Sequence, residues 1–131
     1  MLKLNFHPFP ELETDNLLLK QIKTQDLNDF FRLRSDKNIM RYIARPLAKE
    51  MSDVELLVAK MDAGTRNNET INWGIYLKTT EKLIGSIGYV HIYTDNNRAE
   101  IGYLLDANFQ RKGLMQEAIV GVIAFGFKML K

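Results

Sequence analysis

The chain of 131 residues contains no cysteine, only three prolines and one tryptophan, and its formal net charge is just +2. The absence of cysteine excludes a disulfide framework, a thiol nucleophile and a zinc site built on thiolates. The small net charge gives no argument for nucleic-acid binding. The most apolar stretch, 119–130, is too short for a membrane span and carries Lys128. The first ten residues lack the apolar run of a secretion signal, so we expect a cytoplasmic location and no membrane partner.

The remaining composition is that of a soluble globular protein. Hydrophobic residues make up 46% and charged residues 26% of the sequence. A chain of this length buries a hydrophobic core without disulfides or a structural metal. We therefore expect a single domain that extends over residues 1–131, with no internal repeat or linker.

The first half of the chain predicts one strand and two helices. The aliphatic run 17–22 predicts a strand, and Thr24 is expected to cap the helix that follows it. Ser52 and Glu55 have the spacing of a capping box, which predicts the start of a second helix. That helix is expected to end near Gly64.

The second half predicts an antiparallel meander followed by a long helix. Gly85 and Gly88 are the expected bend or bulge points of the middle strand. Tyr103 is expected to face the core, and a helix is expected from Gly113 to the end. Because short turns join the strands, they should pair as neighbours. The three predicted strands are 71–77, 83–93 and 98–105.

The chain ends at Lys131 inside the last predicted helix. No glycine cap, proline or polar tail follows, and the last turn is apolar. This pattern is typical of a fragment, or of a domain that another chain completes. An uncovered edge beside the 98–105 strand would invite pairing with another chain, so a homodimer is also an expectation.

The segment most informative about chemistry is 100–118, a strand and a basic loop followed by a helix N-terminus. Free backbone N–H groups and the helix dipole favour anions at such an end. Gly113 lets the backbone approach a ligand, and Arg111 and Lys112 add positive charge. The arrangement suits a pyrophosphate, although the same spacing also fits an ordinary basic loop. Neither the GxxxxGK[ST] loop nor the GxGxxG fingerprint is present.

Three segments resemble the GNAT family of N-acetyltransferases, in particular the group that acetylates N-terminal amines of ribosomal proteins. They are LETDNLLLKQIKTQDLNDFFRL, LIGSIGYVHI and RAEIGYLLDANFQRKGLMQEA. The resemblance covers the chain from Leu12 onward and implies an α+β, three-layer fold. Its mixed, mainly antiparallel sheet would be flanked by helices, and the family's C-terminal strands would be lacking here.

The resemblance also implies a binding site for acetyl-CoA as co-substrate. The family's Gln/Arg-x-x-Gly-x-Gly/Ala loop falls on Gln110, Gly113 and Met115, where methionine departs from the small residue of the pattern. The loop amides from Arg111 to Met115 would hold the phosphates. Leu104 and Leu105 match strand positions whose main chain pairs with pantetheine. The implied cofactor-binding residues are Leu104, Leu105, Gln110, Arg111, Lys112, Gly113, Leu114 and Met115.

The implied reaction is direct attack of an amine on the thioester of acetyl-CoA. The pKa of a terminal α-amine is about 7.7–8.0 and that of lysine about 10.4, so a site with a modest base favours an α-amine. The expected acceptor is the amine of a protein N-terminus or of a small molecule. A backbone N–H near Leu104 or Leu105 would meet the oxyanion. Glu100 is the candidate catalytic base; the alternative is a solvated glutamate paired with Arg98.

Other functions stay open from the sequence. A catalytically incomplete module that binds acyl-CoA or a partner is the main alternative, and the bulk of Met115 favours it. An RNA-binding module would need stacking aromatics such as Tyr89 and Tyr93 within a basic face, and nucleic acid is not an expected partner. His7 and His91 lack the spacing of metal ligands, so no metal is predicted.

Overall fold

The computed structural model describes residues 4–41, 43, 45–96 and 98–129, which form one five-stranded sheet and three α-helices. The strand order is β1-β2-β3-β4-β5, and all the pairs in it are antiparallel. The strands are β1 (Leu12–Glu13), β2 (Leu17–Lys20), β3 (Ile71–Leu77), β4 (Leu83–Tyr93) and β5 (Arg98–Leu105). The helices are α1 (Leu27–Ser35), α2 (Met51–Arg66) and α3 (Leu114–Met129), with 3-10 turns η1 (Thr24–Asp26) and η2 (Ala107–Phe109).

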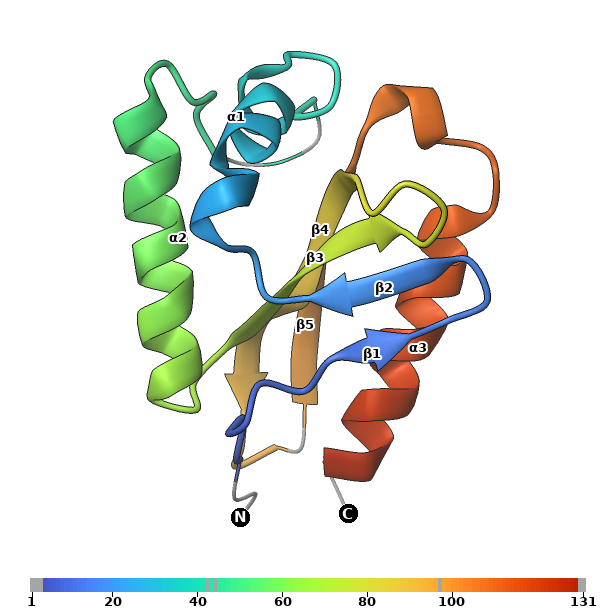
Figure 1. Ribbon diagram of the computed structural model, residues 1–131. Coiled ribbons are helices and arrows are strands. Elements are labelled where there is room, and N and C mark those ends of the chain that lie inside the picture. The colour runs from blue at the N-terminus through green and yellow to red at the C-terminus, as the bar shows by residue number, and fades with distance from the viewer. Residues whose placement is uncertain (1–3, 42, 44, 97, 130–131) are drawn as a thin grey trace.

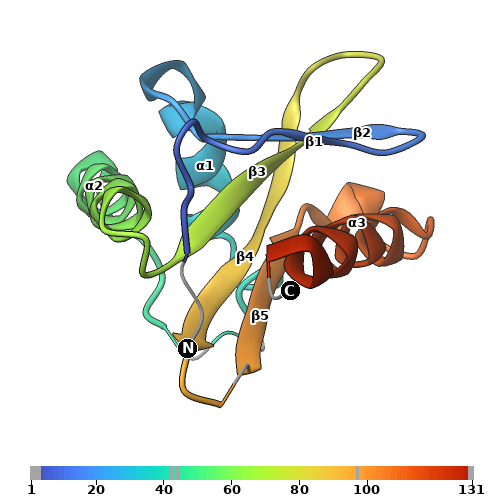
Figure 2. The ribbon, with the colours of Figure 1, turned by 90° about the horizontal axis from the view of Figure 1, so that it is seen from below.

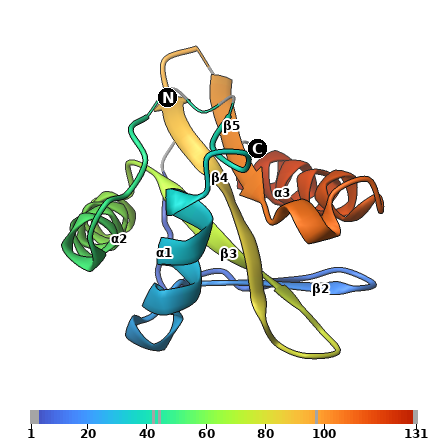
Figure 3. The same cartoon turned by 90° about the horizontal axis from the view of Figure 1, so that it is seen from above.

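The elements form three layers (Figure 1). Seen along the sheet, α1 and α2 cover one face and α3 covers the other (Figure 2). The view from the opposite end shows the same division, with β4 and β5 between the helices (Figure 3). The expected antiparallel sheet flanked by helices is confirmed.

The entry into α1 differs from the prediction. The strand β2 ends at Lys20, short of the predicted boundary, and it pairs with the unpredicted two-residue strand β1. Thr24 is not the cap. The carboxylate of Asp26 instead accepts the Lys23 N–H at 2.9 Å, which places the chain reversal one turn before α1. This is the reciprocal bond of a capping box, from the N–H of the cap residue Lys23 to an acid three residues on, and not the hydroxyl bond expected of Thr24.

The predicted capping box at Ser52 and Glu55 is also wrong. Asp53 Oδ2 accepts the N–H groups of Lys49 and Glu50 at 2.8 and 3.1 Å, so the cap is Glu50 and α2 begins at Met51, two residues earlier than predicted. These two bonds hold the pKa of Asp53 below its usual value. The helix continues past Gly64 to Arg66 because no residue there takes a left-handed conformation before Asn68.

The meander matches the predicted boundaries, but its irregularities lie beside the glycines and not at them. The register shifts leave Ile84 without a partner on β3 and Val90 without a partner on β5. Gly88 is needed for close approach, because a Cβ there would lie 2.4 Å from the Ile71 carbonyl oxygen. A Cβ at Gly85 would lie equally close to the carbonyl oxygen of Leu104. The glycines therefore admit the neighbouring strands, while bulky residues form the bulges.

The sheet separates two hydrophobic clusters. One lies between the sheet and α3 and contains the fully buried Trp73, whose Nε1–H donates to the Pro10 carbonyl at 2.7 Å. The other lies under α1 and α2 and contains Tyr76. Packing of Trp73 and Tyr76 in the meander is thus confirmed. Tyr103 is not in the core: it is 52% exposed, because β5 is the last strand of the sheet and nothing in the described chain covers it there.

The last helix packs on the sheet as the helical spacing predicts. Its buried positions are Ala118, Val122 and Gly126, and the Tyr89 hydroxyl donates to the Val122 carbonyl at 2.6 Å. A Cβ on Gly126 would lie 2.2 Å from that hydroxyl, so the small residue lets the helix approach β4. Among the described residues, no helix combines the length and apolar character needed to cross a membrane.

Candidate active site

A cavity of about 1030 Å³ extends around the free edge of β5. Residues from both faces of that strand line it: Gly102 and Leu104 on the α1–α2 side, and Tyr103 and Leu105 on the other. Its far wall comes from α1, the loop that follows and α2. The near wall is the loop that leads from η2 into α3. The cavity therefore joins a basic loop to a deeper region under the first two helices.

The edge of β5 offers main-chain groups to a ligand. Asp106 N–H donates to the Ile84 carbonyl at 2.7 Å, so this position faces β4. Because main-chain groups alternate along a strand, those of Leu105 and Tyr103 face the open edge. Gln110 Nε2 donates to the Leu105 carbonyl at 3.0 Å. The edge thus presents the Leu105 N–H and the Tyr103 main chain, which suits a strand-like ligand.

The loop before α3 has the backbone geometry of an anion cradle. Arg111 and Gly113 take φ values of 63° and 76°, and nothing lies within 4 Å of a Cβ built on Gly113. The first bond within α3 runs from the Glu117 N–H to the Gly113 carbonyl. The N–H groups at 114–116 therefore have no acceptor within the helix, and the dipole of a sixteen-residue helix adds to them. Such an end favours a phosphate.

The structure brings most of the predicted cofactor residues together. Six line the cavity: Leu104, Leu105, Gln110, Arg111, Gly113 and Met115. Lys112 and Leu114 do not: the Lys112 ammonium lies 5.7 Å from the Phe109 ring centre, and Leu114 packs on the core. Met115 both lines the cavity and packs against the core, so it is not wholly exposed to the ligand space.

Glu100 lies near the N-terminal end of β5, on the same strand face as Gly102. Its side chain is exposed, and its Oε1 lies 3.4 Å from the Tyr93 hydroxyl. Arg98 does not form the ion pair that was the alternative; its guanidinium stacks 4.4 Å from the Tyr93 ring centre. The described cavity lining begins on β5 at Gly102, two residues beyond Glu100.

Comparison with known proteins identifies the family. A family model described as "Acetyltransferase (GNAT) domain" matches residues 16–131. The chain belongs to the GNAT acetyltransferase family. An uncharacterized N-acetyltransferase, YoaA of Bacillus subtilis (strain 168), is 34% identical over 122 residues, which cover 93% of this chain and 69% of YoaA. The match to YnaD of the same strain covers 65% of that protein. This GNAT chain thus spans about two thirds of the length of these relatives.

Solved GNAT structures share the fold. The self-immunity acetyltransferase MccE, solved with acetyl-CoA and AMP, has a TM-score of 0.76 at 25% identity, over 85% of this chain and 62% of MccE. RimL, a ribosomal L7/L12 alpha-N-protein acetyltransferase solved with coenzyme A, has a TM-score of 0.79 at 16% identity. That match covers 88% of this chain and 67% of RimL. The RimL likeness shows the fold alone.

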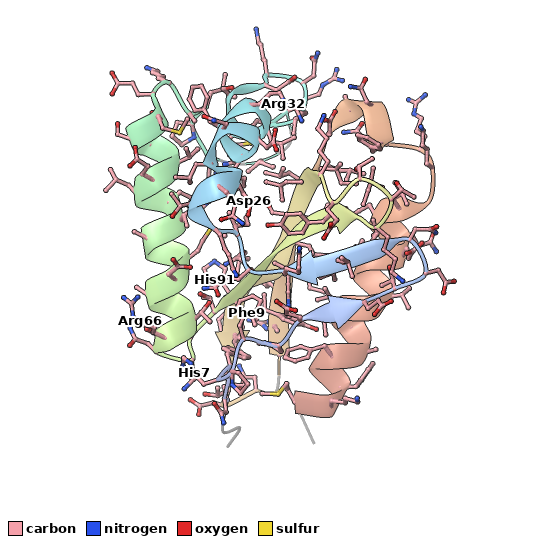
Figure 4. All side chains as sticks on the ribbon, in the orientation of Figure 1. His7, Phe9, Asp26, Arg32, Arg66 and His91 are labelled. Atoms are coloured by element: carbon pink, nitrogen blue, oxygen red, sulfur yellow. The ribbon has the colours of Figure 1, made fainter. Side chains whose placement is uncertain are left out.

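A half-buried ion pair that the sequence analysis missed fixes the start of the GNAT loop. Asp106 is 3% exposed, and its Oδ2 lies 2.8 Å from Arg32 Nη2. Arg32 lies on α1 (Figure 4). Its other oxygen accepts the Asn108 N–H at 3.0 Å and caps η2. The pair ties the first helix to the turn that leads into the loop. Because Asp106 and Arg32 are far apart in the sequence, no local pattern predicts that they pair.

A second missed contact holds the N-terminal turn of α3. The Glu117 carboxylate accepts hydrogen bonds from the Thr14 hydroxyl, the Asn16 N–H and the Asn16 side-chain amide. Partial burial opposes ionisation, but these bonds outweigh it and lower the pKa of Glu117. The contacts anchor the end of α3 that carries the free amides to the β1–β2 turn.

The remaining candidates lie outside the cavity. His91 stacks on Tyr93, and His7 Nε2 lies 3.1 Å from the Arg66 carbonyl oxygen, so both histidines have packing roles (Figure 4). Tyr89 is 8% exposed and cannot stack on a base, which removes the aromatic pair that an RNA-binding surface would need. Within the described ranges, no group of three or more histidine, aspartate or glutamate side chains is placed to hold a metal.

Proposed function

We propose that this chain binds acetyl-CoA and transfers its acetyl group to a primary amine. The observation that carries the proposal is the juxtaposition of the free-amide loop at Gly113 with the open main chain at Leu105, both lining one cavity. A diphosphate fits the first and an extended amide-containing arm fits the second. Family membership and the acetyl-CoA named with MccE support it.

The chain's own residues divide the binding work. The amides at 111–115 and the Arg111 side chain would hold the diphosphate, and the Tyr103–Leu105 edge would align the pantetheine arm. Gln110, by occupying the Leu105 carbonyl, keeps the loop against the strand. The Leu105 N–H would then face the carbonyl oxygen on which charge develops. Acetyl-CoA supplies the activated thioester, and the protein supplies orientation and hydrogen bonds.

The acceptor most compatible with the site is a protein N-terminal α-amine. Only a neutral amine attacks a thioester, and deprotonating a lysine near neutral pH costs roughly 3 kcal/mol more than deprotonating an α-amine. The described cavity lining contains one carboxylate, Glu69, and no histidine, so strong bases are scarce there. RimL, whose fold this chain shares, is named as an alpha-N-protein acetyltransferase.

Glu100 is proposed as the base, acting through water because its exposed carboxylate lies outside the described cavity lining. Glu100→Gln should lower kcat with little change in affinity for acetyl-CoA. It should also remove a limb of the pH–rate profile. Glu11→Gln is the matched control, because Glu11 is also exposed and does not line the cavity. An unchanged profile for Glu100→Gln would reject the assignment.

The proposal is tested by calorimetric titration of acetyl-CoA, followed by detection of free thiol when amines are added. The wild-type chain should bind one equivalent and release thiol with α-amine peptides. Gly113→Asp should abolish binding, because it strains a left-handed backbone and places a carboxylate at the phosphate position. Retained binding in that variant would refute the site. Binding without thiol release would indicate an acyl-CoA-binding module and not an enzyme.

A further inference from the structure

Two arginines line the cavity on the side away from the basic loop. Arg34 lies on α1 and Arg45 in the segment that follows, and both contribute to the cavity wall. Neither side chain forms an ion pair or a hydrogen bond within the described residues. Arg32, two residues earlier on α1, differs because it pairs with Asp106. The two cavity arginines are therefore a like-charged pair without a carboxylate.

The surroundings of Arg34 make this pairing costly. Its side chain is half-buried, with the guanidinium carbon 6.0 Å from the Phe30 ring centre. Burial lowers the pKa of Arg34, and the nearby charge of Arg45 lowers it further. A protein gains nothing in stability from a partly desolvated cation beside another cation. Such an arrangement is expected where a ligand brings the missing negative charge.

The charged residues elsewhere in this part of the cavity do not offset the two arginines. Lys60 of α2 also lines it, and Glu69 is the sole carboxylate among the described lining residues. Apolar side chains lie between these charges, including Ile39, Ile43 and Leu57. A charge-assisted hydrogen bond is stronger in such surroundings than in water. The region therefore offers basic groups to an anion between apolar walls.

This basic region is separate from the loop assigned to the diphosphate. Arg34 belongs to the layer on the α1–α2 face of the sheet, whereas Gly113 precedes α3, which covers the opposite face. A molecule lying on β5 with its diphosphate at Gly113 leaves the Arg34 side to the acceptor. We propose that Arg34 and Arg45 bind an anionic group of the acceptor, a carboxylate or a phosphate, so that the preferred amine substrate carries negative charge. This inference rests on the proposed function.

The test compares three short peptides with a free α-amine, carrying aspartate, asparagine or phosphoserine at the second position. Each is titrated calorimetrically into the CoA-bound and the free protein. We expect about tenfold tighter binding of the aspartate or the phosphoserine peptide than of the asparagine peptide, and the tighter of the two identifies the anion. Arg34→Gln and Arg45→Gln should each reduce this preference to about twofold or less, while Arg34→Lys retains part of it.

Arg66→Gln is the matched control. Arg66 ends α2, and its side chain points away from the sheet (Figure 4). This variant should keep the full preference, which separates a built site from general attraction by a basic protein. Equal or undetectable binding of the three peptides by the wild-type chain would overturn the inference. So would a preference that survives in the Arg34→Gln, Arg45→Gln double variant.

Two further measurements keep the outcomes distinguishable. Thermal unfolding should give a midpoint for Arg34→Gln equal to or above that of the wild type, since the change removes a desolvated, repelled charge; a loss of binding then cannot be ascribed to unfolding. Acetyl-CoA affinity is measured separately. Normal acetyl-CoA binding without anion preference would refute this inference alone. Anion preference that depends on Arg34, without any acetyl-CoA binding, would refute the proposed function alone.

Discussion

The ion pair between Arg32 and Asp106 allows a prediction in which two partners of one contact have unequal effects. Asp106 has a side chain that is 4% exposed, whereas the Arg32 side chain is 42% exposed. Removing the arginine leaves a carboxylate buried without its cation. Removing the charge of the aspartate leaves an arginine that can turn toward water. Arg32→Met should therefore cost more stability than Asp106→Asn.

The magnitudes follow from the surroundings of each group. Breaking a fully buried pair costs about 3–5 kcal/mol. Water reaches Arg32 from one side, so we expect roughly 2–3 kcal/mol for Arg32→Met. In Asp106→Asn the side-chain oxygen can still accept the Asn108 N–H, now 3.0 Å away. That variant should lose only about 1 kcal/mol.

Urea unfolding followed by circular dichroism measures both values at one pH. Arg66→Met, which removes an exposed arginine, is the control and should change the free energy of unfolding by less than about 0.5 kcal/mol. Because Asp106 caps the turn before the loop, Arg32→Met should also weaken acetyl-CoA binding. A smaller cost for Arg32→Met than for Asp106→Asn would refute the reasoning.

Two other predictions concern the packing of α3. Stability contributed by Glu117, whose pKa is lowered in the folded state, is present above its ordinary value of 4.5 and is lost as the pH falls toward the folded value. Glu117→Gln should flatten this acid limb in a pH series of unfolding curves, and an unchanged slope would count against the contact. Gly126→Ala should destabilise the protein by about 2 kcal/mol or more despite better helix propensity, because of the clash with Tyr89. Gly121→Ala meets only a methyl group at 3.2 Å and should be near neutral, and thermal unfolding of the two glycine variants measures the difference.

The sequence was sufficient for those parts of the fold that depend on local periodicity. The meander strands and α3 have strong two-residue or helical apolar patterns. The boundaries of the strands agree with the structure, and α3 begins at Leu114, one residue after the predicted start; its predicted end lies outside the described residues. The helix starts were harder because several acids and hydroxyls compete near each N-terminus. The caps are Lys23 and Glu50, and Asp26 and Asp53 accept their N–H groups from three residues on, so each start lies before the predicted Thr24 or Ser52.

The site could be predicted where a motif is contiguous and not where it depends on tertiary contact. The Gln110–Gly113 loop has a local signature, and its residues line the cavity except Lys112. Asp106 needed Arg32, 74 positions earlier, and the relation between Arg34 and Arg45 depends on how the segment after α1 folds back. Tyr103 was misplaced because alternation alone does not distinguish an edge strand from an interior one.

The most direct test of the central claim is an amide NMR titration of the chain with coenzyme A. The account predicts that the largest shifts fall on the N–H groups at 103–105 and 111–116, with smaller changes elsewhere, and that they vanish in Gly113→Asp. Shifts confined to other segments, or an unaltered spectrum at saturating coenzyme A, would contradict the assignment of the Gly113 loop and the β5 edge as the cofactor site.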